Sequence, residues 1–90
     1  MGKDKLSIII VNFNAGVFLI NCLKSIQDTY SEADIKIFLI DNASSDGSIA
    51  KVLREFAKEE ITYILNKDNL GFGKANNQAL KQIKEGYKSR

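Results

Sequence analysis

Three short polar segments hold the residues that could bind a ligand. They are Asn12-Phe13-Asn14, the segment that begins Asp41-Asn42, and the stretch from Asn69 to Asn77. Each follows an apolar run. A carboxylate such as Asp41 can accept hydrogen bonds from N–H or O–H groups of a ligand, and an aromatic ring such as Phe13 can stack on a base. If the three segments meet in space, their residue types predict a binding site.

Several of these residues also have a structural interpretation. Asp41 can cap its own turn, and Phe13 can pack on the helix that follows it. Asp46 precedes Gly47-Ser48 and an apolar stripe, a pattern that favours a helix N-cap over a ligand contact. Asn76 stands on the apolar stripe of its helix, where an inward amide needs a partner. That partner is either a neighbouring loop or a ligand, and the residues leave both open.

The third polar segment contains Gly71-Phe72-Gly73 ahead of a helical pattern. Glycines permit close backbone approach, and free N–H groups at a helix start can hold phosphate. The segment is only a partial dinucleotide fingerprint, because the third glycine is missing and because it follows the third apolar run rather than the first. It is not a P-loop either, since Lys74 is followed by Ala75.

Three apolar runs, 6–11, 35–40 and 61–65, lead into the polar segments and predict β-strands. The first two are nearly continuous, which is typical of strands covered on both faces, whereas the third is shorter and predicts an edge strand. The intervening segments show helical spacing, with three expected core stripes. The stripes are Phe18, Leu19, Cys22, Leu23 and Ile26; Ile49, Val52, Leu53 and Phe56; and Phe72, Ala75, Asn76, Ala79, Leu80 and Ile83. Cys22 is thus expected to be an inert core residue, and Gly86 to end the last helix.

This alternation predicts a three-layer, Rossmann-like α/β unit, β-α-β-α-β-α, with parallel strands in the spatial order 3-2-1. We expect one domain over residues 1–90 with its core at 6–85. Ligands of open parallel sheets bind outside the carboxyl ends of the strands, where all three Asn-rich segments should converge. The first strand would have a bare apolar edge, so we expect self-association through it or coverage by the tail of the chain.

Composition limits the remaining classes. The chain has 90 residues, 44% of them hydrophobic and 27% charged, with a formal net charge of +2. This excludes a two-lobed enzyme and disorder, and it does not favour a nucleic-acid partner. His is absent and Cys22 is the single Cys, which removes His-based triads and multi-Cys zinc sites. With no signal peptide or anchor expected, the predicted location is cytoplasmic.

The motifs VNFN, IDNASSDGS and NLGFGKANNQAL, in this order, resemble the start of the family-2 glycosyltransferases of GT-A fold. The resemblance covers Leu6 to about Ile83 and implies the nucleotide-sugar-binding first half of that fold. It implies that Phe13 contacts the base and that Asp41 accepts a hydrogen bond from a pyrimidine N–H. It also brings the 69–77 segment near base and ribose. The nucleotide-binding residues expected are Asn12, Phe13, Asn14, Asp41, Asn42, Asn69, Gly71, Asn76 and Asn77.

The resemblance also implies an inverting transfer from a UDP- or dTDP-sugar to a glycan or lipid-linked acceptor. Asn76 and Ala79 depart from the common Arg and Gly, as in a subgroup associated with rhamnosyl and related transfer. The family's D-x-D motif and catalytic base have no counterpart in these ninety residues. We therefore expect a divalent metal, Mg or Mn, only in the full-length enzyme, and we expect that enzyme to be cytoplasmic or peripheral to a membrane. The chain alone is expected to be inactive.

Two other classes are weighed against this interpretation. One is a stand-alone flavodoxin-like or receiver-like binding module, but a receiver needs acidic residues where Asn12 and Asn14 stand. The other is a fragment of a dinucleotide-binding oxidoreductase, which is disfavoured because no Gly-rich turn follows the first strand.

Overall fold

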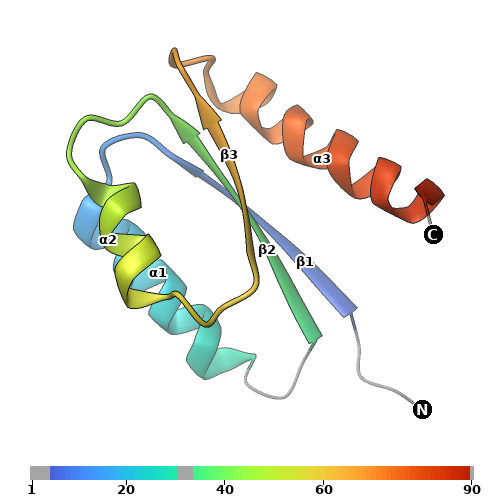
Figure 1. The fold of residues 1–90 in the computed structure, drawn as a ribbon, viewed down its shortest axis with the longest axis horizontal. Coiled ribbons are helices and arrows are strands. Elements are labelled where there is room, and N and C mark those ends of the chain that lie inside the picture. The colour runs from blue at the N-terminus through green and yellow to red at the C-terminus, as the bar shows by residue number, and fades with distance from the viewer. Residues whose placement is uncertain (1–4, 31–33, 90) are drawn as a thin grey trace.

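The three apolar runs form the strands of one sheet. A computed structural model describes residues 5–30 and 34–89. Its elements are β1 (Lys5–Asn12), α1 (Gly16–Thr29), β2 (Asp34–Asn42), α2 (Ser48–Glu55), β3 (Ile61–Asn66) and α3 (Phe72–Ser89). The strands are parallel in the order β1-β2-β3, with α1 and α2 on one face and α3 on the other (Figure 1). The predicted three-layer α/β fold and strand order are confirmed.

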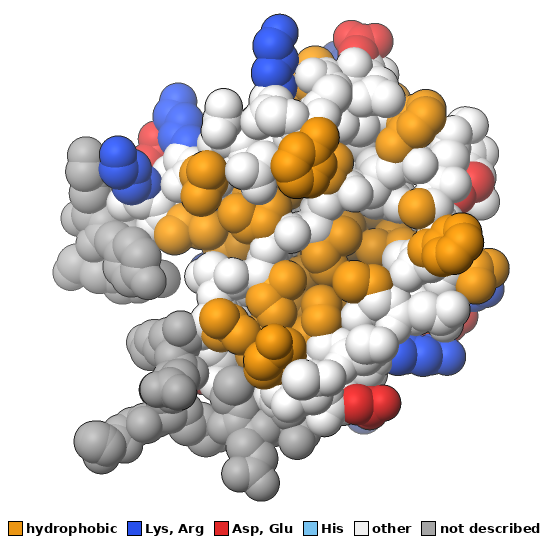
Figure 2. All heavy atoms as spheres, turned by 180° about the vertical axis from the view of Figure 1, so that it is seen from behind, with side chains coloured by type: hydrophobic (Ala, Val, Ile, Leu, Met, Phe, Trp, Pro, Cys, Tyr) orange, Lys and Arg blue, Asp and Glu red, His pale blue; other side chains and the backbone are white. Residues whose placement is uncertain are grey.

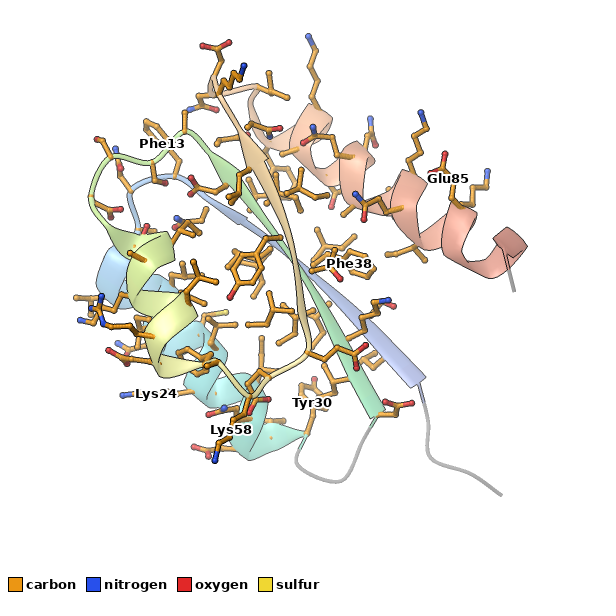
Figure 3. All side chains as sticks on the ribbon, viewed as in Figure 1. Phe13, Lys24, Tyr30, Phe38, Lys58 and Glu85 are labelled. Atoms are coloured by element: carbon orange, nitrogen blue, oxygen red, sulfur yellow. The ribbon has the colours of Figure 1, made fainter. Side chains whose placement is uncertain are left out.

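The core is split in two by the sheet, because successive side chains of β2 point to opposite faces. Ile37 and Leu39 belong to the cluster under α1 and α2, whereas Phe38 and Ile40 belong to the cluster under α3. Figure 3 shows Phe38 on the α3 side of the sheet. The buried helical partners are Leu19, Ile20, Leu23, Val52 and Phe56 on the first face, and Ala75 and Ala79 on the second.

The sequence stripes are partly wrong about which helical residues face the core. Cys22 is exposed, and the exposed fraction of Phe18 is 80%. The buried face of α1 is centred on Leu19, Ile20 and Leu23, so the predicted stripe lay too far to one side. Three more expected core residues have exposed side chains: Leu53, Phe72 and Leu80. Among the side chains of α3 whose burial is described, residues 72–85, the hydrophobic ones that pack on the sheet are the small Ala75 and Ala79 and half-buried Ile83.

The last helix is longer than expected. It continues through Gly86 to Ser89, because a glycine inside a helix costs only about 1 kcal/mol relative to alanine and does not by itself end it. Within the described part of the chain, no helix has the length and apolar character needed to cross a membrane.

The strands also extend further than the apolar runs. Asp41 and Asn42 were expected in a loop, yet both lie in β2, opposite Leu65 and Asn66 of β3. Asn12 likewise ends β1 and pairs with Asp41. These polar residues continue the sheet because their side chains bond to one another across the strands, as described below.

The β1 edge is the least covered part of the sheet. Ile8, Ile9, Ile10 and Val11 are half-buried, whereas Ile37 to Ile40 of β2 are at most 5% exposed. Because β1 lies at the back of Figure 1, Figure 2 faces this edge, and hydrophobic side chains gather across the middle of the view. As predicted, β3 forms the other edge.

Candidate functional site

The carboxyl ends of the three strands lie on one rim of the sheet, and the three polar segments continue from them (Figure 1). The predicted convergence is therefore present. Phe13, which follows β1, lies at this rim with 51% of its side chain exposed (Figure 3). Because about half of this residue is exposed, part of its ring is accessible to a ligand.

One group of polar side chains, here called the Asp41 cluster, consists of Asn12, Asp41, Ser44 and Ser48. The side-chain Nδ2 of Asn12 lies 2.8 Å from Asp41 Oδ1, 2.9 Å from Ser48 Oγ and 3.1 Å from Ser44 Oγ. The backbone N–H of Ser44 donates to Asp41 Oδ2 at 3.0 Å. The cluster lies on the α1/α2 face, because Asp41 follows Ile37 and Leu39 in the alternation of β2.

Asp41 is a buried carboxylate with unused acceptor capacity. Its exposed fraction is 6%, and its hydrogen-bond partners are an amide and a backbone N–H. Since a carboxylate offers about four lone-pair positions, each oxygen can still accept a further hydrogen bond. Asp41 does cap its own turn through Ser44, and this structural role leaves the ligand role open.

The loop after β2 is held against the loop after β1. Ser44 Oγ accepts a hydrogen bond from the Asn14 N–H at 2.8 Å, and Asn14 Oδ1 accepts one from the Ser45 N–H at 2.8 Å. Asn14 and Ala43 have positive φ angles of 50° and 64°. Ala43 pays a steric cost for this conformation, which indicates that the surrounding bonds determine the shape of the loop.

Asp46 connects the starts of two helices. Its Oδ1 accepts hydrogen bonds from the Ser48 hydroxyl at 2.6 Å and the Ser48 N–H at 3.0 Å, and its Oδ2 accepts one from the Gly16 N–H at 3.1 Å. The Ser48 hydroxyl, and then the Ser48 N–H, hold the pKa of Asp46 below its ordinary value. The prediction that Asp46 is the N-cap is wrong by one residue, because Gly47 occupies that position, but Asp46 does accept the N–H of Ser48, the first residue of α2.

A second group, here called the amide cluster, lies on the α3 face and consists of the Asn42, Asn66 and Gln78 side chains with the Gly71 carbonyl. Asn66 Nδ2 donates to Asn42 Oδ1 and to Gln78 Oε1, both at 2.9 Å. Gln78 Nε2 donates back to Asn66 Oδ1 at 2.9 Å, and Asn42 Nδ2 donates to the Gly71 carbonyl at 3.3 Å. The cluster joins β2, β3 and α3.

The turn before α3 is closed by Asn69 and Gly71. Asn69 Oδ1 accepts the Gly71 N–H at 2.9 Å, and Gly71 has a φ of 82°, in the region that favours glycine. The Gly71 carbonyl also accepts the Ala75 N–H at 3.3 Å, as the first bond of the helix. Asn69 and Gly71 are both exposed at the rim.

The predicted site residues therefore divide into two kinds. Phe13, Asn14, Asn69, Gly71 and Asn77 are exposed, and Asn76 is half-buried on α3. Asn12 and Asn42 are only 1% and 2% exposed, and their amides bond to protein groups, so their side chains support the rim from below.

Four further polar residues take part in the rim that the sequence did not single out: Ser44, Ser48, Asn66 and Gln78. Asn66 lies at the end of β3, just before the third polar segment, and its register opposite Asn42 could have revealed it. Gln78 gave no sequence signal.

A hollow of about 440 Å³ lies away from the rim, at the amino ends of β2 and β3. Its lining includes Asp34, Glu59, Glu60 and Tyr30, and Figure 3 shows Tyr30 at the opposite end of the sheet from Phe13. Three carboxylates would repel an anionic nucleotide, so the rim is the better candidate for such a ligand.

Metal ligands do not come together in the described residues, which contain no group of three or more Asp, Glu, Cys or His side chains able to hold an ion. The described residues thus do not form a metal site on their own, and Asp41 accepts hydrogen bonds from Asn12 Nδ2 and from the Ser44 N–H.

Comparison with known proteins bears on the family and the fold of the chain. The family model described as Glycosyl transferase family 2 matches residues 7–87. A teichoic acid poly(glycerol phosphate) polymerase of Staphylococcus epidermidis is 30% identical over 87 residues, which cover 93% of this chain and 12% of that protein. A solved mannosyltransferase of Pyrobaculum calidifontis, in complex with GDP-Man and Mn2+, superposes with a TM-score of 0.78 at 21% identity. That match covers 90% of this chain and 25% of the mannosyltransferase, and it shows a shared fold.

Proposed function

Because this chain belongs to glycosyl transferase family 2, we propose that its strand-end rim binds the nucleotide of a sugar donor for an inverting transfer reaction. The proposed donor is a UDP- or dTDP-sugar, the transferred group a hexosyl or rhamnosyl unit, and the acceptor a glycan or a lipid-linked glycan. The chain spans a small part of both proteins compared above, so these properties are proposed for the enzyme that contains it.

The observation that carries the proposal is the burial and the hydrogen bonding of Asp41. A buried carboxylate is costly unless it is well bonded, and this one has neutral partners and free acceptor positions at the rim. The N3–H of uracil or thymine is a single donor that suits such an acceptor. A bond between a charged acceptor and a neutral donor is about twice as strong as a neutral one.

Other rim residues have complementary roles. Phe13 is exposed beside the first loop and can stack on the base. The exposed turn at Asn69 and Gly71 lets the backbone approach the base and ribose closely. Guanine also presents ring and amino N–H donors, and the mannosyltransferase compared above was solved with GDP-Man. The choice of base is therefore the first point to test.

We further propose that transfer itself needs residues beyond these ninety. A divalent Mg or Mn ion would neutralise the diphosphate leaving group, and a base would deprotonate the acceptor hydroxyl. The described residues supply no such metal site. The 90-residue chain should therefore bind nucleotide without transferring sugar.

The test is a titration of the chain with UDP, dTDP, GDP and NAD, followed by backbone amide chemical shifts. We expect UDP and dTDP to shift the amides of Phe13, Asp41 and Asn69. Asp41→Asn should reduce the affinity about tenfold, because it removes the charged acceptor. Asp28→Asn, an exposed control of the same chemistry on α1, should leave the affinity unchanged. A response to NAD with none to the pyrimidine nucleotides would overturn the proposal, and a response to GDP alone would replace the donor class.

The β1 edge supports a second proposal, that it mediates self-association of the 90-residue chain. An uncovered apolar edge strand is a template for pairing. Sedimentation should show a dimer that Ile9→Lys weakens, whereas Lys58→Glu, a charge change on the far side of the sheet, should not. A monomer at all concentrations with rapidly exchanging amides from Ile8 to Val11 would contradict it.

A further inference from the structure

We propose that Gln78 and Asn66 are positioning residues, which hold the Asn69–Gly71 turn in place beside Asp41 and thereby set the affinity of the rim for a nucleotide. This inference rests on the proposed function. Neither residue was expected at the site, and both act through the amide cluster rather than by touching a ligand.

The Gly71 carbonyl, at one end of the cluster, determines the orientation of every side-chain amide in it. The Gly71 carbonyl can only accept a hydrogen bond, so Asn42 must present its Nδ2 to it. Asn42 Oδ1 then faces β3, where Asn66 must present its Nδ2. Asn66 Oδ1 in turn faces α3 and accepts from Gln78 Nε2, while Gln78 Oε1 accepts from Asn66. Replacing a single NH2 by oxygen therefore breaks at least one of these bonds, because the Gly71 carbonyl prevents the whole chain of bonds from reversing.

The two ends of this series of hydrogen bonds, Gly71 and Gln78, lie on one continuous segment that comprises the turn and the start of α3. Gly71 directly precedes α3, and Gln78 lies two turns further along it. The strand ends of β2 and β3 are bonded between them, so the turn cannot slide relative to the sheet without losing the bonds. Asn42 also follows Asp41 in β2, and the two side chains point to opposite faces. The cluster thus links the turn to the backbone that carries Asp41.

A role in stability alone would not need this polarity. Asn42 is 2% exposed, and an apolar group of similar size could fill the same space. The three amides instead give the turn a single position, and a ligand that contacts both the turn and Asp41 gains from not having to order them on binding.

The test replaces one side-chain NH2 group by oxygen in each variant and compares it with matched controls. Gln78→Glu and Asn66→Asp each replace an NH2 by oxygen inside the amide cluster. Gln82→Glu on α3 and Asn21→Asp on α1 make the same exchanges at exposed positions. Uridine and guanosine serve as probes, and amide shifts are followed under conditions where urea unfolding shows each variant to be fully folded. Below saturation, the slope of shift against nucleoside concentration is proportional to affinity.

We expect Gln78→Glu and Asn66→Asp to reduce the slope about tenfold for the nucleoside that binds, while the two controls stay within about twofold of the unaltered chain. In the absence of ligand, both cluster variants should also shift the Gly71 amide and the Asn42 side-chain NH2, although Gly71 bonds to neither substituted side chain.

The outcomes separate the two proposals. If the unaltered chain binds neither nucleoside, the proposed function fails, and with it the effect on affinity. If it binds one of them and the folded cluster variants bind it equally well, the positioning role is overturned while the proposed function stands. Equal losses in the controls would also overturn it, because the effect would then follow charge rather than the cluster.

Discussion

The Asp41 cluster and the amide cluster originate from consecutive residues of the same strand, and they differ in charge. Asp41 and Asn42 end β2 and point to opposite faces, and each bonds to the residue paired with it on a neighbouring strand, Asn12 or Asn66. On the α1/α2 face the bonds surround a carboxylate. On the α3 face they join neutral amides that donate and accept in turn.

This difference separates two tasks. A carboxylate with spare acceptor positions attracts a donor from a ligand, whereas an amide chain with its bonds satisfied has nothing left to offer one and instead holds the backbone. Packing both at the end of one strand places a recognition group directly beside the turn that must approach the same ligand. The two clusters should therefore respond differently to the same chemical change.

The largest difference between the two clusters is expected in the unfolding free energy when one Asn of each cluster is replaced by Asp. Asn12→Asp places a second carboxylate against buried Asp41, and an uncompensated buried charge costs about 3–5 kcal/mol of unfolding free energy at neutral pH. Asn66→Asp meets neutral amides, and the loss should be about 1–3 kcal/mol. Urea unfolding of both variants measures the difference.

Acidification sharpens this comparison. In the Asn12→Asp protein, one of the two facing carboxyls will have a raised pKa, so the folded state holds a proton that the unfolded state releases. Its stability should therefore rise, relative to the unaltered chain, as the pH falls from neutrality. Asn66→Asp should show a weaker rise. Equal losses and equal pH profiles would contradict the distinction between the clusters.

A smaller effect is expected from the glycines of the two regions. Gly71, whose carbonyl belongs to the amide cluster, and Gly47, which precedes α2, have φ angles of 82° and 79°, and an added Cβ would meet nothing within 4 Å at either. Alanine at each position should cost about 1 kcal/mol from the backbone alone. Only Gly71→Ala should also weaken nucleoside binding.

Gly73 provides the control for this pair. It lies in the first turn of α3 with open space around it, so Gly73→Ala should stabilise the fold by about 0.5–1 kcal/mol. A loss of stability there would show that crowding, rather than the left-handed backbone, limits these positions. Thermal unfolding of the Gly71→Ala, Gly47→Ala and Gly73→Ala variants measures these changes in stability.

The smallest effect concerns Asp46, which is exposed and borders the Asp41 cluster through Ser48. Its pKa is held below the ordinary value of an Asp, first by the Ser48 hydroxyl and then by the Ser48 N–H. A lowered folded pKa contributes stability above the unfolded value, and this contribution is lost as the pH falls through the folded pKa. Asp46→Asn should therefore lower the urea midpoint near neutral pH, and the difference should shrink as the pH falls through the folded pKa of Asp46. A difference independent of pH would assign the effect to geometry.

Much of the fold could be predicted from periodicity. The continuous apolar runs of β1 and β2 indicated a sheet covered on both faces, and their alternation with helical stripes indicated parallel strands. The helical faces were less predictable. Phe18 and Cys22 fit an apolar stripe as well as Ile20 does, and only the rotation of α1 against the sheet decides which of them is buried.

The place of the candidate site could be predicted from the sequence. Parallel strands bring the segments after them to one rim, so Phe13, Asp41 and Asn69 could be grouped from the sequence. Which polar residues would bond to one another could not. That depended on the register of the strands, which sets Asn12 opposite Asp41 and Asn42 opposite Asn66.

The sequence by itself therefore determined the layer order, the family and the rim, because periodicity and local motifs are properties of neighbouring residues. The tertiary structure decided that Asn12 and Asn42 are buried supports, that Asp41 keeps acceptor positions free, and that Gln78 reaches Asn66. These follow from contacts between residues 12 or more positions apart, whose geometry depends on how strands pair and helices pack.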